Sequence, residues 1–411
     1  MSPTVLVTGV GVVGGHGCGM DALRQALESG VPRLSEVDRS AGYHRENGAR
    51  RACLTPPGCL KEWLSPVEGR RMSPPSKLAV VASRMALRQA GLGGEPEGLS
   101  TAVVLSTAFG PSSYSEALLK QILFEGPEAA SPFYFTESVA NAPAAQIAIA
   151  CRARGPSVTV CQREAGPLLA VGQGAAAVAS GRVRRALAGS VDEMSPLLHA
   201  LLDRFGALAT GEQGDEVARP FDRRRDGFLA GEGASVLLLE SEESAAERGA
   251  RPLARIRAWG SAFDPTAPPT GWGTGHAELA RALRRGLARA GAPASGRPEL
   301  FGIDRVVSGG SGSRGGDRLE ARMLRAAWDG SPLPPVLAPK AVTGEYGGGH
   351  LGAAVLAVLG APFGPTAGFR EPDPELGLTP HDGSPLPPPA RVLVTSVAAG
   401  GAAAWLVLEG A

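Results

Sequence analysis

Hydrophobic residues recur along the chain in two patterns that alternate with each other. Short apolar runs bounded by glycine or charged residues predict buried strands, and longer segments with apolar residues three or four positions apart predict helices. Strands are expected at residues 4–8, 102–106, 158–160, 185–188, 236–240, 254–259, 305–308, 391–395 and 403–408. Helices are expected near 21–27, over 77–90, 165–180, 278–290, 318–327 and 351–359, and after Asn141, whereas 31–75 is expected to be mostly loop. Strands that alternate with helices are typical of an α/β sheet protein.

The second half of the chain repeats the plan of the first. Strand, helix, strand and helix follow one another from residue 254 to 327, and a pair of strands closes the chain. The repetition lies in the pattern and not in residue identity, so it indicates a weak internal duplication.

Composition and charge narrow the class of protein. The chain has 411 residues, of which 43% are hydrophobic, and its charged groups sum to +1. A sizeable core is therefore possible, and nothing in the charge points to nucleic acid or to an anionic membrane as a partner. No run approaches the roughly 18 apolar residues that a membrane span needs. The opening MSPTVLVTGV has no signal-peptide features, and we expect a soluble cytoplasmic protein.

The cysteines suggest neither a disulfide framework nor a metal site. They are Cys18, Cys53, Cys59, Cys151 and Cys161. An odd number of cysteines without regular spacing argues against a disulfide framework. Cys53 and Cys59 lack the second pair of ligands that a zinc site needs, so we expect no bound metal.

A glycine motif follows the first strand. Gly9, Gly11 and Gly14 form a literal G-x-G-x-x-G with acidic residues further along, so a dinucleotide-binding site has to be considered. The residues after Gly14 are poor helix formers, and the next helix begins only near Asp21. The glycines are better explained by a tight structural turn, and no cofactor is expected.

Residues 155–166 read GPSVTVCQREAG and raise a question of chemistry. The strand-like run over 157–160 ends at Cys161, and an apolar helix pattern starts at Ala165. A nucleophile at a strand-to-helix turn has this setting, because a helix N-terminus lowers the pKa of a thiol and stabilises developing negative charge. The chemistry depends on whether Cys161 or Glu164 stands at the start of the helix.

Several sequence blocks follow one another along the whole chain, and the most specific is FDRRRDGFLAGEGASVLLLE at 221–240. The others are VLVTGVGVV near the start, SPFYFTESVANAPAAQIAI (131–149), GPSVTV (155–160), RRALAGSVDE (184–193), DRLEA (317–321), PKAVTGEYGGGHLGAA (339–354) and the closing SVAAGGAAAWLVLE. Together these blocks resemble β-ketoacyl synthases, the thiolase-fold condensing enzymes of fatty acid and polyketide synthesis. The resemblance implies a thiolase-like α/β fold of two similar halves in five layers (α/β/α/β/α). It places these ketosynthase-like halves at 1–250 and 251–411.

The resemblance also implies which residue holds the nucleophile position. The interval from Glu164 to the Ala188-Gly189 pair, and the small residues directly after Glu164, match the spacing that follows the family's cysteine. Glu164 is therefore placed at that position. Cys161 lies too early, and we expect it to be an inert, buried side chain at the end of a buried strand.

Both histidines of a working synthase are missing from the positions that the resemblance gives them. The segment 260–272 contains no histidine, and His276 follows at the start of a helix, where it is expected to be exposed. Gly309 occupies one family histidine position, in SGGSGS, and Glu345 occupies another, in KAVTGEYGG. His350 reaches that second position only with a gap of five residues.

Two further positions match the family, namely its lysine at Lys340 and its acidic residue at Glu320. Claisen condensation needs a thiolate to carry the acyl chain and imidazoles to polarise the malonyl thioester, and this chain lacks both. A carboxylate at Glu164 is a poor nucleophile, but it suits the helix end as a fixed anion. We expect Lys340 to pair with Glu345 or Glu164.

The first hypothesis for function is a non-condensing subunit. The chain resembles the chain length factor, or ketosynthase β, of type II polyketide synthases, which pairs with a catalytic ketosynthase and shapes the elongation pocket. The resemblance implies a heterodimer with that ketosynthase and contact with an acyl carrier protein. The arginines of 182–185 and 223–225 would meet the acidic carrier or simply face solvent. Glutamate at 164 departs from the glutamine that is usual in such subunits.

Two other hypotheses stay open. A malonyl-thioester decarboxylase, or an atypical acyltransferase or condensing enzyme, would use Glu164 chemically, although both polarising histidines are missing. An NAD-dependent oxidoreductase would rest on residues 9–14 alone, while the other blocks fit the condensing family. The charged residues of FDRRRDGF are expected to fix loops and the dimer and not to touch substrate.

Overall fold

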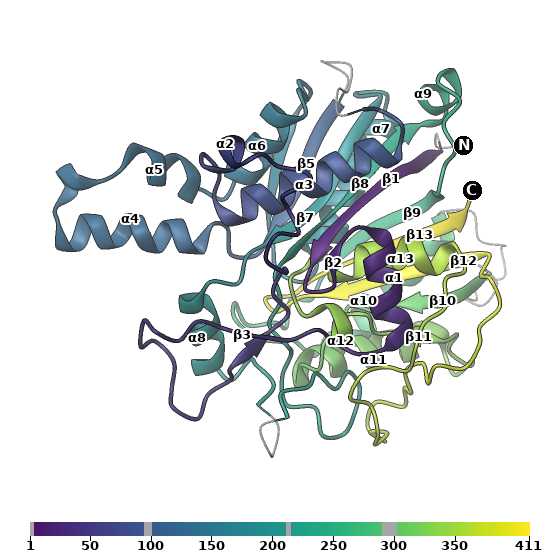
Figure 1. Cartoon of the computed structure of the whole chain (residues 1–411). Coiled ribbons are helices and arrows are strands. Elements are labelled where there is room, and N and C mark those ends of the chain that lie inside the picture. The colour runs from purple at the N-terminus through teal and green to yellow at the C-terminus, as the bar shows by residue number, and fades with distance from the viewer. Residues whose placement is uncertain (1–3, 94–100, 211–214, 290–301) are drawn as a thin grey trace.

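A computed structural model describes residues 4–93, 101–210, 215–289 and 302–411 of the chain. Within this part, a mixed sheet runs through both halves of the molecule (Figure 1). Its strands follow in the order β6 (Ser157–Cys161), β5 (Thr101–Thr107), β7 (Arg185–Asp192), β8 (Gly233–Ser241), β1 (Val5–Gly14), β9 (Ala254–Phe263), β13 (Ala402–Gly410), β12 (Arg391–Val397), β10 (Ile303–Val307) and β11 (Val336–Leu337). The short β2 (Gly17–Cys18) pairs with β1, and β3 (Ser35–Glu36) pairs separately with β4 (Arg51–Ala52).

The two halves share one strand topology. In the first half β6, β5 and β7 are parallel, and β8 and β1 follow as antiparallel neighbours. In the second half β11, β10 and β12 are parallel, and β13 and β9 follow in the same way. Antiparallel pairing of residues 5–7 with 254–256 joins the halves. The expected duplication is present in the topology, while the division between 250 and 251 stays a prediction.

Helices cover the strands on both outer faces and fill the space between the halves. The outer helices of the first half are α3 (Pro74–Gln89) and α6 (Ala142–Ala150), and those of the second are α10 (His276–Arg289) and α11 (Arg314–Trp328). Between the halves lie α7 (Gly166–Ala179) and α13 (Leu351–Val358), each of which contacts strands of both halves. The result is the expected α/β/α/β/α succession of layers.

The remaining helices surround this body. They are α1 (Met20–Ser29), α2 (Pro66–Gly69), α4 (Ser112–Phe124), α5 (Pro132–Ser138), α8 (Pro196–Arg204), α9 (Glu242–Glu247) and α12 (Lys340–Thr343). Helices α4 and α5 contact each other and project together from the side of the molecule (Figure 1). As expected, most of the segment 31–75 is loop.

The glycine motif lies inside a strand and not in a turn, which corrects the sequence-based expectation. A side chain at Gly9 would place its Cβ 2.0 Å from the backbone oxygen of Ala86 in α3, and one at Gly11 would lie 1.7 Å from that of Ala82. The glycines therefore let α3 lie directly on β1. This packing accounts for the motif without a nucleotide.

Cys18 and Cys59 form a disulfide, with their Cα atoms 6.0 Å apart. The sequence argued against disulfides, and that expectation is wrong for this pair. The bond joins β2 to a loop that is 41 residues further along the chain, so no regular spacing announces it. Cys53 and Cys151 are buried and free, and burial raises the pKa of these thiols to about 12 and about 11.

The charged residues of FDRRRDGF fix loops, as expected. The buried carboxylate of Asp222 accepts hydrogen bonds from the backbone N–H groups of Arg370 (2.6 Å) and Glu371 (2.7 Å). Arg225 forms an ion pair with Asp373 at 2.6 Å. Both contacts tie the loop before β8 to the loop before β12.

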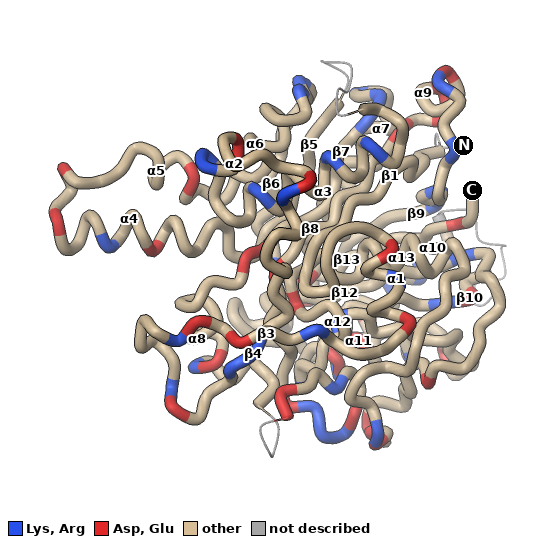
Figure 2. The backbone as a smooth tube through the Cα atoms, in the orientation of Figure 1, with Lys and Arg blue, Asp and Glu red and all other residues tan. Residues whose placement is uncertain are grey.

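Charges of both signs are spread over the backbone in Figure 2, in keeping with the small net charge. Among the helices of the described residues, none has the length and the apolar character needed to cross a bilayer.

Candidate functional site

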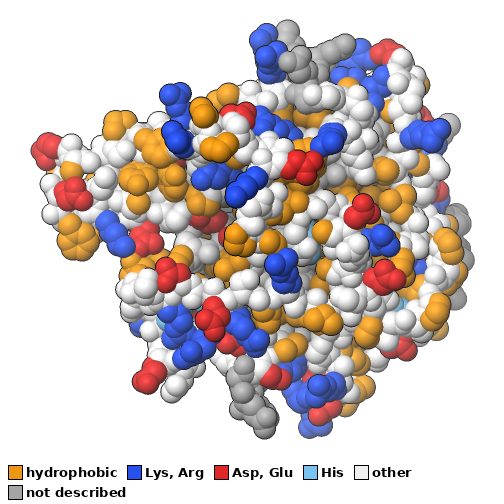
Figure 3. All heavy atoms as spheres, viewed as in Figure 1, with side chains coloured by type: hydrophobic (Ala, Val, Ile, Leu, Met, Phe, Trp, Pro, Cys, Tyr) orange, Lys and Arg blue, Asp and Glu red, His pale blue; other side chains and the backbone are white. Residues whose placement is uncertain are grey.

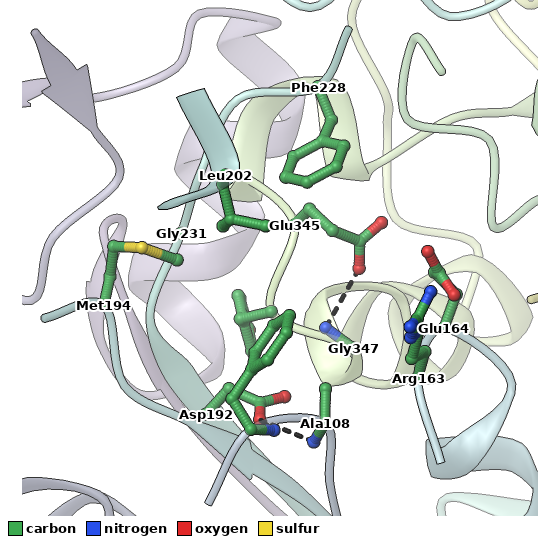
Figure 4. A pocket seen from close by; sticks show the side chains of 12 residues that line it. Ala108, Arg163, Glu164, Asp192, Met194, Leu202, Phe228, Gly231, Glu345 and Gly347 are labelled. Atoms are coloured by element: carbon green, nitrogen blue, oxygen red, sulfur yellow. Dashed lines mark hydrogen bonds between the residues drawn. The ribbon is translucent and has the colours of Figure 1, made fainter. Parts of the chain in front are cut away.

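A small cavity lies where the C-terminal end of β7, the turn between β6 and α7, and the segment after α12 meet. The residues that line it are Ala108, Phe109, Arg163, Glu164, Asp192, Met194, Leu202, Phe228, Gly231, Glu345, Tyr346 and Gly347 (Figure 4). Its volume is about 40 Å³, far below the roughly 300–1,000 Å³ of pockets that hold small organic ligands. The cavity of this single chain is thus too small for an acyl chain.

Glu164 lies directly before α7 and is held by the end of β12 and by the loop that follows it. Its backbone oxygen accepts a hydrogen bond from the hydroxyl of Ser396 at 2.7 Å. Its carboxylate accepts the N–H of Ala399 at 3.3 Å. Ala165 is the N-cap of α7, so Glu164 directly precedes the helix, as expected. The contacts from the second half of the chain fix the carboxylate at the cavity wall.

The environment of Glu164 favours its protonated form. Burial raises the pKa of its carboxyl to about 7, and the nearby charge of Glu345 adds to the effect, while Lys340 and Arg163 oppose it. Figure 4 shows the carboxylates of Glu164 and Glu345 turned toward the same space. Desolvation thus opposes the fixed anion that the sequence suggested. The carboxylate accepts its hydrogen bond from Ala399, which lies outside α7.

Lys340 pairs with Glu345, one of the two partners expected for it. Its ammonium nitrogen lies 2.8 Å and 2.9 Å from the two carboxylate oxygens, and its side chain is fully buried. Glu345 also accepts the N–H of Gly347 at 3.0 Å (Figure 4). Glu345 thus holds the buried cation next to the cavity, and Arg163 is a second positive charge near Glu164.

Gly309 lies next to the same loop, at a point where no larger side chain fits. A Cβ at Gly309 would lie 2.7 Å from the hydroxyl oxygen of Ser396. Glu320 lies behind Gly309 and outside the cavity, where its buried carboxyl accepts hydrogen bonds from Thr395 (2.6 Å) and from the N–H of Gly309 (3.2 Å). Burial raises the pKa of Glu320 to about 7. Glu320 therefore supports the loop and does not face the cavity.

Neither histidine near these positions reaches the cavity. His350 is fully buried at the start of α13, and burial holds its pKa well below the ordinary value. His276 begins α10, and its Nδ1 atom lies at hydrogen-bond distance, 2.9 Å, from the backbone oxygen of Thr274. It is partly and not fully exposed. Among the described residues, no imidazole and no thiol lines the cavity.

Asp192 is a cavity residue that the sequence did not single out. It ends β7 and accepts hydrogen bonds from the hydroxyl of Thr107 (2.9 Å) and the N–H of Ala108 (2.7 Å). Burial raises its pKa to about 7. The block RRALAGSVDE indicated the family but gave no role to Asp192. Its position at the end of a predicted strand was the sequence feature that could have marked it as a candidate site residue.

Cys161 is exposed, which corrects the expectation of a buried thiol. It ends β6, which pairs only with β5 in the described residues and is therefore an edge strand. The apolar residues over 157–160 suggested a buried strand, but an edge strand can carry the same apolar pattern. Cys161 does not line the cavity.

The cavity can hold and exchange protons, but it offers no evident nucleophile. Three carboxyl groups, from Glu164, Asp192 and Glu345, share it with the buried cation of Lys340. No cluster of His, Cys, Asp or Glu in the described part of the chain has the arrangement to hold a metal ion.

The comparisons with known proteins agree with this fold. A family model described as "Beta-ketoacyl synthase, N-terminal domain" matches residues 2–245, and the chain belongs to the β-ketoacyl synthase family. It is 29% identical over 395 residues to the tetracenomycin polyketide synthase ketoacyl synthase alpha subunit of Streptomyces glaucescens, covering 91% of this chain and 89% of the relative. It is 30% identical over 388 residues to the beta subunit of the same synthase, covering 91% and 90%.

A solved structure described as the ishigamide ketosynthase/chain length factor is similar over the whole of both chains, with 31% identity and a TM-score of 0.88. The thiolase-like α/β fold expected from the resemblance is thereby confirmed. The chain is thus a relative of the ketosynthase and chain length factor subunits of type II polyketide synthases. Identity to the alpha and the beta subunit is nearly equal, so overall similarity does not separate the two roles.

Proposed function

We propose that this protein is a non-condensing subunit of the chain length factor type. In this role it pairs with a catalytic ketosynthase in type II polyketide biosynthesis and shapes the pocket in which that partner elongates a chain. The observation that carries the proposal is Glu164, which stands before α7 beside the Lys340–Glu345 ion pair. A thiolate and imidazoles would be needed there for condensation.

The size of the cavity supports a role without an acyl intermediate on this chain. A bound polyketide intermediate needs several hundred Å³ of space, and the cavity has about 40 Å³. The side chains of Phe109, Leu202 and Phe228 take up part of the wall. The growing chain would then lie in the partner's pocket, with this subunit as one boundary.

The surface around β6 supports pairing with another subunit. Large hydrophobic side chains stand exposed on α4 (Leu119, Leu123 and Phe124), α5 (Phe135), α6 (Ile149) and β6 (Val158). Figure 3 shows hydrophobic side chains gathered on the projecting part that α4 and α5 form. An open strand edge beside a large apolar patch is typical of a protein interface. An acidic acyl carrier protein is the further partner that the family implies.

Co-expression tests the proposal directly. The protein is produced with and without a cysteine-containing ketosynthase encoded beside it, and the mixtures are analysed by size-exclusion chromatography and an elongation assay. We expect a heterodimer that elongates only when the partner keeps its cysteine. A stable monomer that ignores such partners would contradict the proposal.

One observation favours a second function, in which Glu164 acts chemically. A carboxyl group whose pKa is raised to about 7 can give or accept a proton at neutral pH. A malonyl-thioester decarboxylase would use it in that way. The Glu164→Gln heterodimer separates the two functions. Retained product formation supports the structural role, and lost turnover in an intact heterodimer supports the enzyme.

A further inference from the structure

The disulfide between Cys18 and Cys59 joins two segments at the surface of the molecule. Cys18 ends β2, directly before the residues that begin α1. Cys59 lies in a turn, where its N–H donates to the backbone oxygen of Pro56 at 3.1 Å. Both cysteines are partly exposed, so a small reductant can reach the bond.

The loop that carries Cys59 has few other ties to the molecule. Leu60 is partly buried against the core around α3. The backbone hydrogen bonds of Cys59 to Pro56 and of Lys61 to Gly58 stay inside the loop. Apart from contacts with Cys18, the hydrogen bonds of 56–61 in the described residues are local, and they include those from the N–H groups of Trp63 and Leu64 to the backbone oxygen of Leu60. The disulfide therefore ties this loop to a distant segment, together with the packing of Cys59 and Leu60 against the core.

The same loop lies beside a cleft at the molecular surface. With the first turn of α3 it encloses an open cleft of about 300 Å³. At the inner end of the loop, the N–H of Thr55 donates to the carboxylate of Glu232 at 3.0 Å. The other carboxylate oxygen of Glu232 accepts the N–H of Met194 at 3.4 Å, and Met194 lines the cavity. A short chain of contacts thus leads from the disulfide to the cavity wall.

We propose that Cys18 and Cys59 are a redox-sensitive site, at which a dithiol reductant opens the loop over 55–61. Reduction releases the loop from β2, widens the cleft beside α3 and loosens the contact of Thr55 with Glu232. The oxidised protein holds the loop closed. This site is separate from the chemistry proposed for Glu164, so either proposal can fail without the other.

The exchange reaction is balanced by the reductant. A thiolate of the dithiol attacks one sulfur of the Cys18–Cys59 bond, forms a mixed disulfide and releases the other cysteine as a thiolate. The second thiol of the reductant then attacks the mixed disulfide. The reductant leaves as its own cyclic disulfide, and the two electrons and two protons that it loses end on Cys18 and Cys59.

The test compares the full chain, purified without reductant, before and after treatment with dithiothreitol. N-ethylmaleimide labelling followed by peptide mass spectrometry reports which thiols are free in the native protein. We expect labelling of Cys161 before reduction and of Cys18 and Cys59 in addition after it. Hydrogen exchange should show about a tenfold loss of amide protection over 55–61 after reduction.

Variants separate the disulfide from other effects of the reductant. The double variant Cys18→Ser/Cys59→Ser should exchange like the reduced protein with or without dithiothreitol. Cys161→Ser is the matched control, since it removes an exposed thiol outside the bond, and it should keep the full response. The proposal is wrong if Cys18 and Cys59 are labelled before any reduction, or if exchange over 55–61 does not change on reduction of the wild-type chain.

Discussion

At the scale of single residues, the environment of Glu164 depends on contacts with a distant part of the chain. The carboxyl group stands directly before α7, in contact with the backbone of Ala399. The buried ammonium group of Lys340, next to the cavity, forms its ion pair with Glu345 and not with Glu164. With a pKa of about 7, Glu164 can exchange a proton near neutral pH.

This assignment predicts how stability depends on pH. The carboxyl of Glu164 has a pKa of about 7 in the folded chain, against an ordinary value of 4.5. Between these pH values the folded state binds more protons than the unfolded state. The contribution of Glu164 to stability is therefore fully present below about pH 4.5 and is lost as the pH rises through 7. Glu164→Gln removes this loss. We expect the variant to be more stable than the wild type at pH 8, by on the order of 1–2 kcal/mol, and equal to it at pH 4.

Urea denaturation at both pH values measures the difference. The other buried carboxyls, such as Asp192 and Glu320, are present in both proteins and cancel in the comparison. A variant less stable than the wild type at pH 8 would restore the idea of a helix-bound anion.

The ion pair of Lys340 predicts a second effect on stability. Removal of one partner from a buried pair leaves an uncompensated charge, which typically costs about 3–5 kcal/mol. We expect Lys340→Met to be destabilised by about 3 kcal/mol, and the matched double variant Lys340→Met/Glu345→Gln to recover at least half of that loss. Chemical denaturation of the three proteins checks both values. Equal destabilisation of the single and the double variant would show that the pair itself matters little.

At the scale of secondary-structure elements, the sequence predicted most segments because their patterns depend on local contacts. Helices α3, α7 and α11 and the central strands lie close to their expected ranges. β1 is longer than expected. Its glycines were interpreted as the end of the strand, but they lie within it and allow close contact with α3. β6 was expected to be buried. Its residues are instead exposed or partly exposed, because within the described chain only β5 pairs with it.

The candidate site divides in the same way. Glu164, Gly309, Lys340 and Glu345 could be placed because ordered blocks on either side fixed their positions. Their roles could not, since these depend on contacts between segments such as Ser396 with Glu164, separated by 232 residues. The disulfide was not predicted either, because it also depends on a contact between distant segments, those of Cys18 and Cys59.

The exposed end of β6 gives a prediction for Cys161. The thiol is open in the single chain, and pairing along β6 would cover it. We expect iodoacetamide to alkylate Cys161 in the isolated protein and at least ten times more slowly in the complex with a ketosynthase. Mass spectrometry of the labelled peptide follows both rates. Equal rates would place the interface elsewhere.

A charge on the same strand should weaken the pairing. The side chain of Val158 is 39% exposed on β6, whereas that of Val31 is 65% exposed between α1 and β3. We expect Val158→Lys to raise the Kd of the heterodimer at least tenfold, because a lysine on an edge strand opposes pairing. Val31→Lys is the matched control and should leave the Kd unchanged. Titration calorimetry measures both, and equal effects would contradict the interface.

At the scale of the whole molecule, the two halves share a plan but depend on each other. Helix α7 contacts β9 and β13 of the second half, and α13 contacts β1 and β8 of the first. Each half alone would expose the strands that the inner helix of the other half covers, and the apolar face of its own inner helix. We therefore expect the fragment 1–250 not to fold by itself, as judged by circular dichroism and limited proteolysis. Co-expression with 251–411 should restore a folded complex, and a folded, monomeric 1–250 would contradict this dependence.

The two ends of the sheet differ. At β11 the chain covers its own edge, since the N–H of His381 donates to the backbone oxygen of Val336 at 2.8 Å, whereas β6 is left open in the described residues. A sheet with two open edges could add neighbours on both sides and grow into a filament. A sheet with one open edge can accept a single neighbour, and if that neighbour is built in the same way, growth stops there. If β6 is the contact edge, as proposed, we expect the covered end at β11 to limit the assembly to a pair.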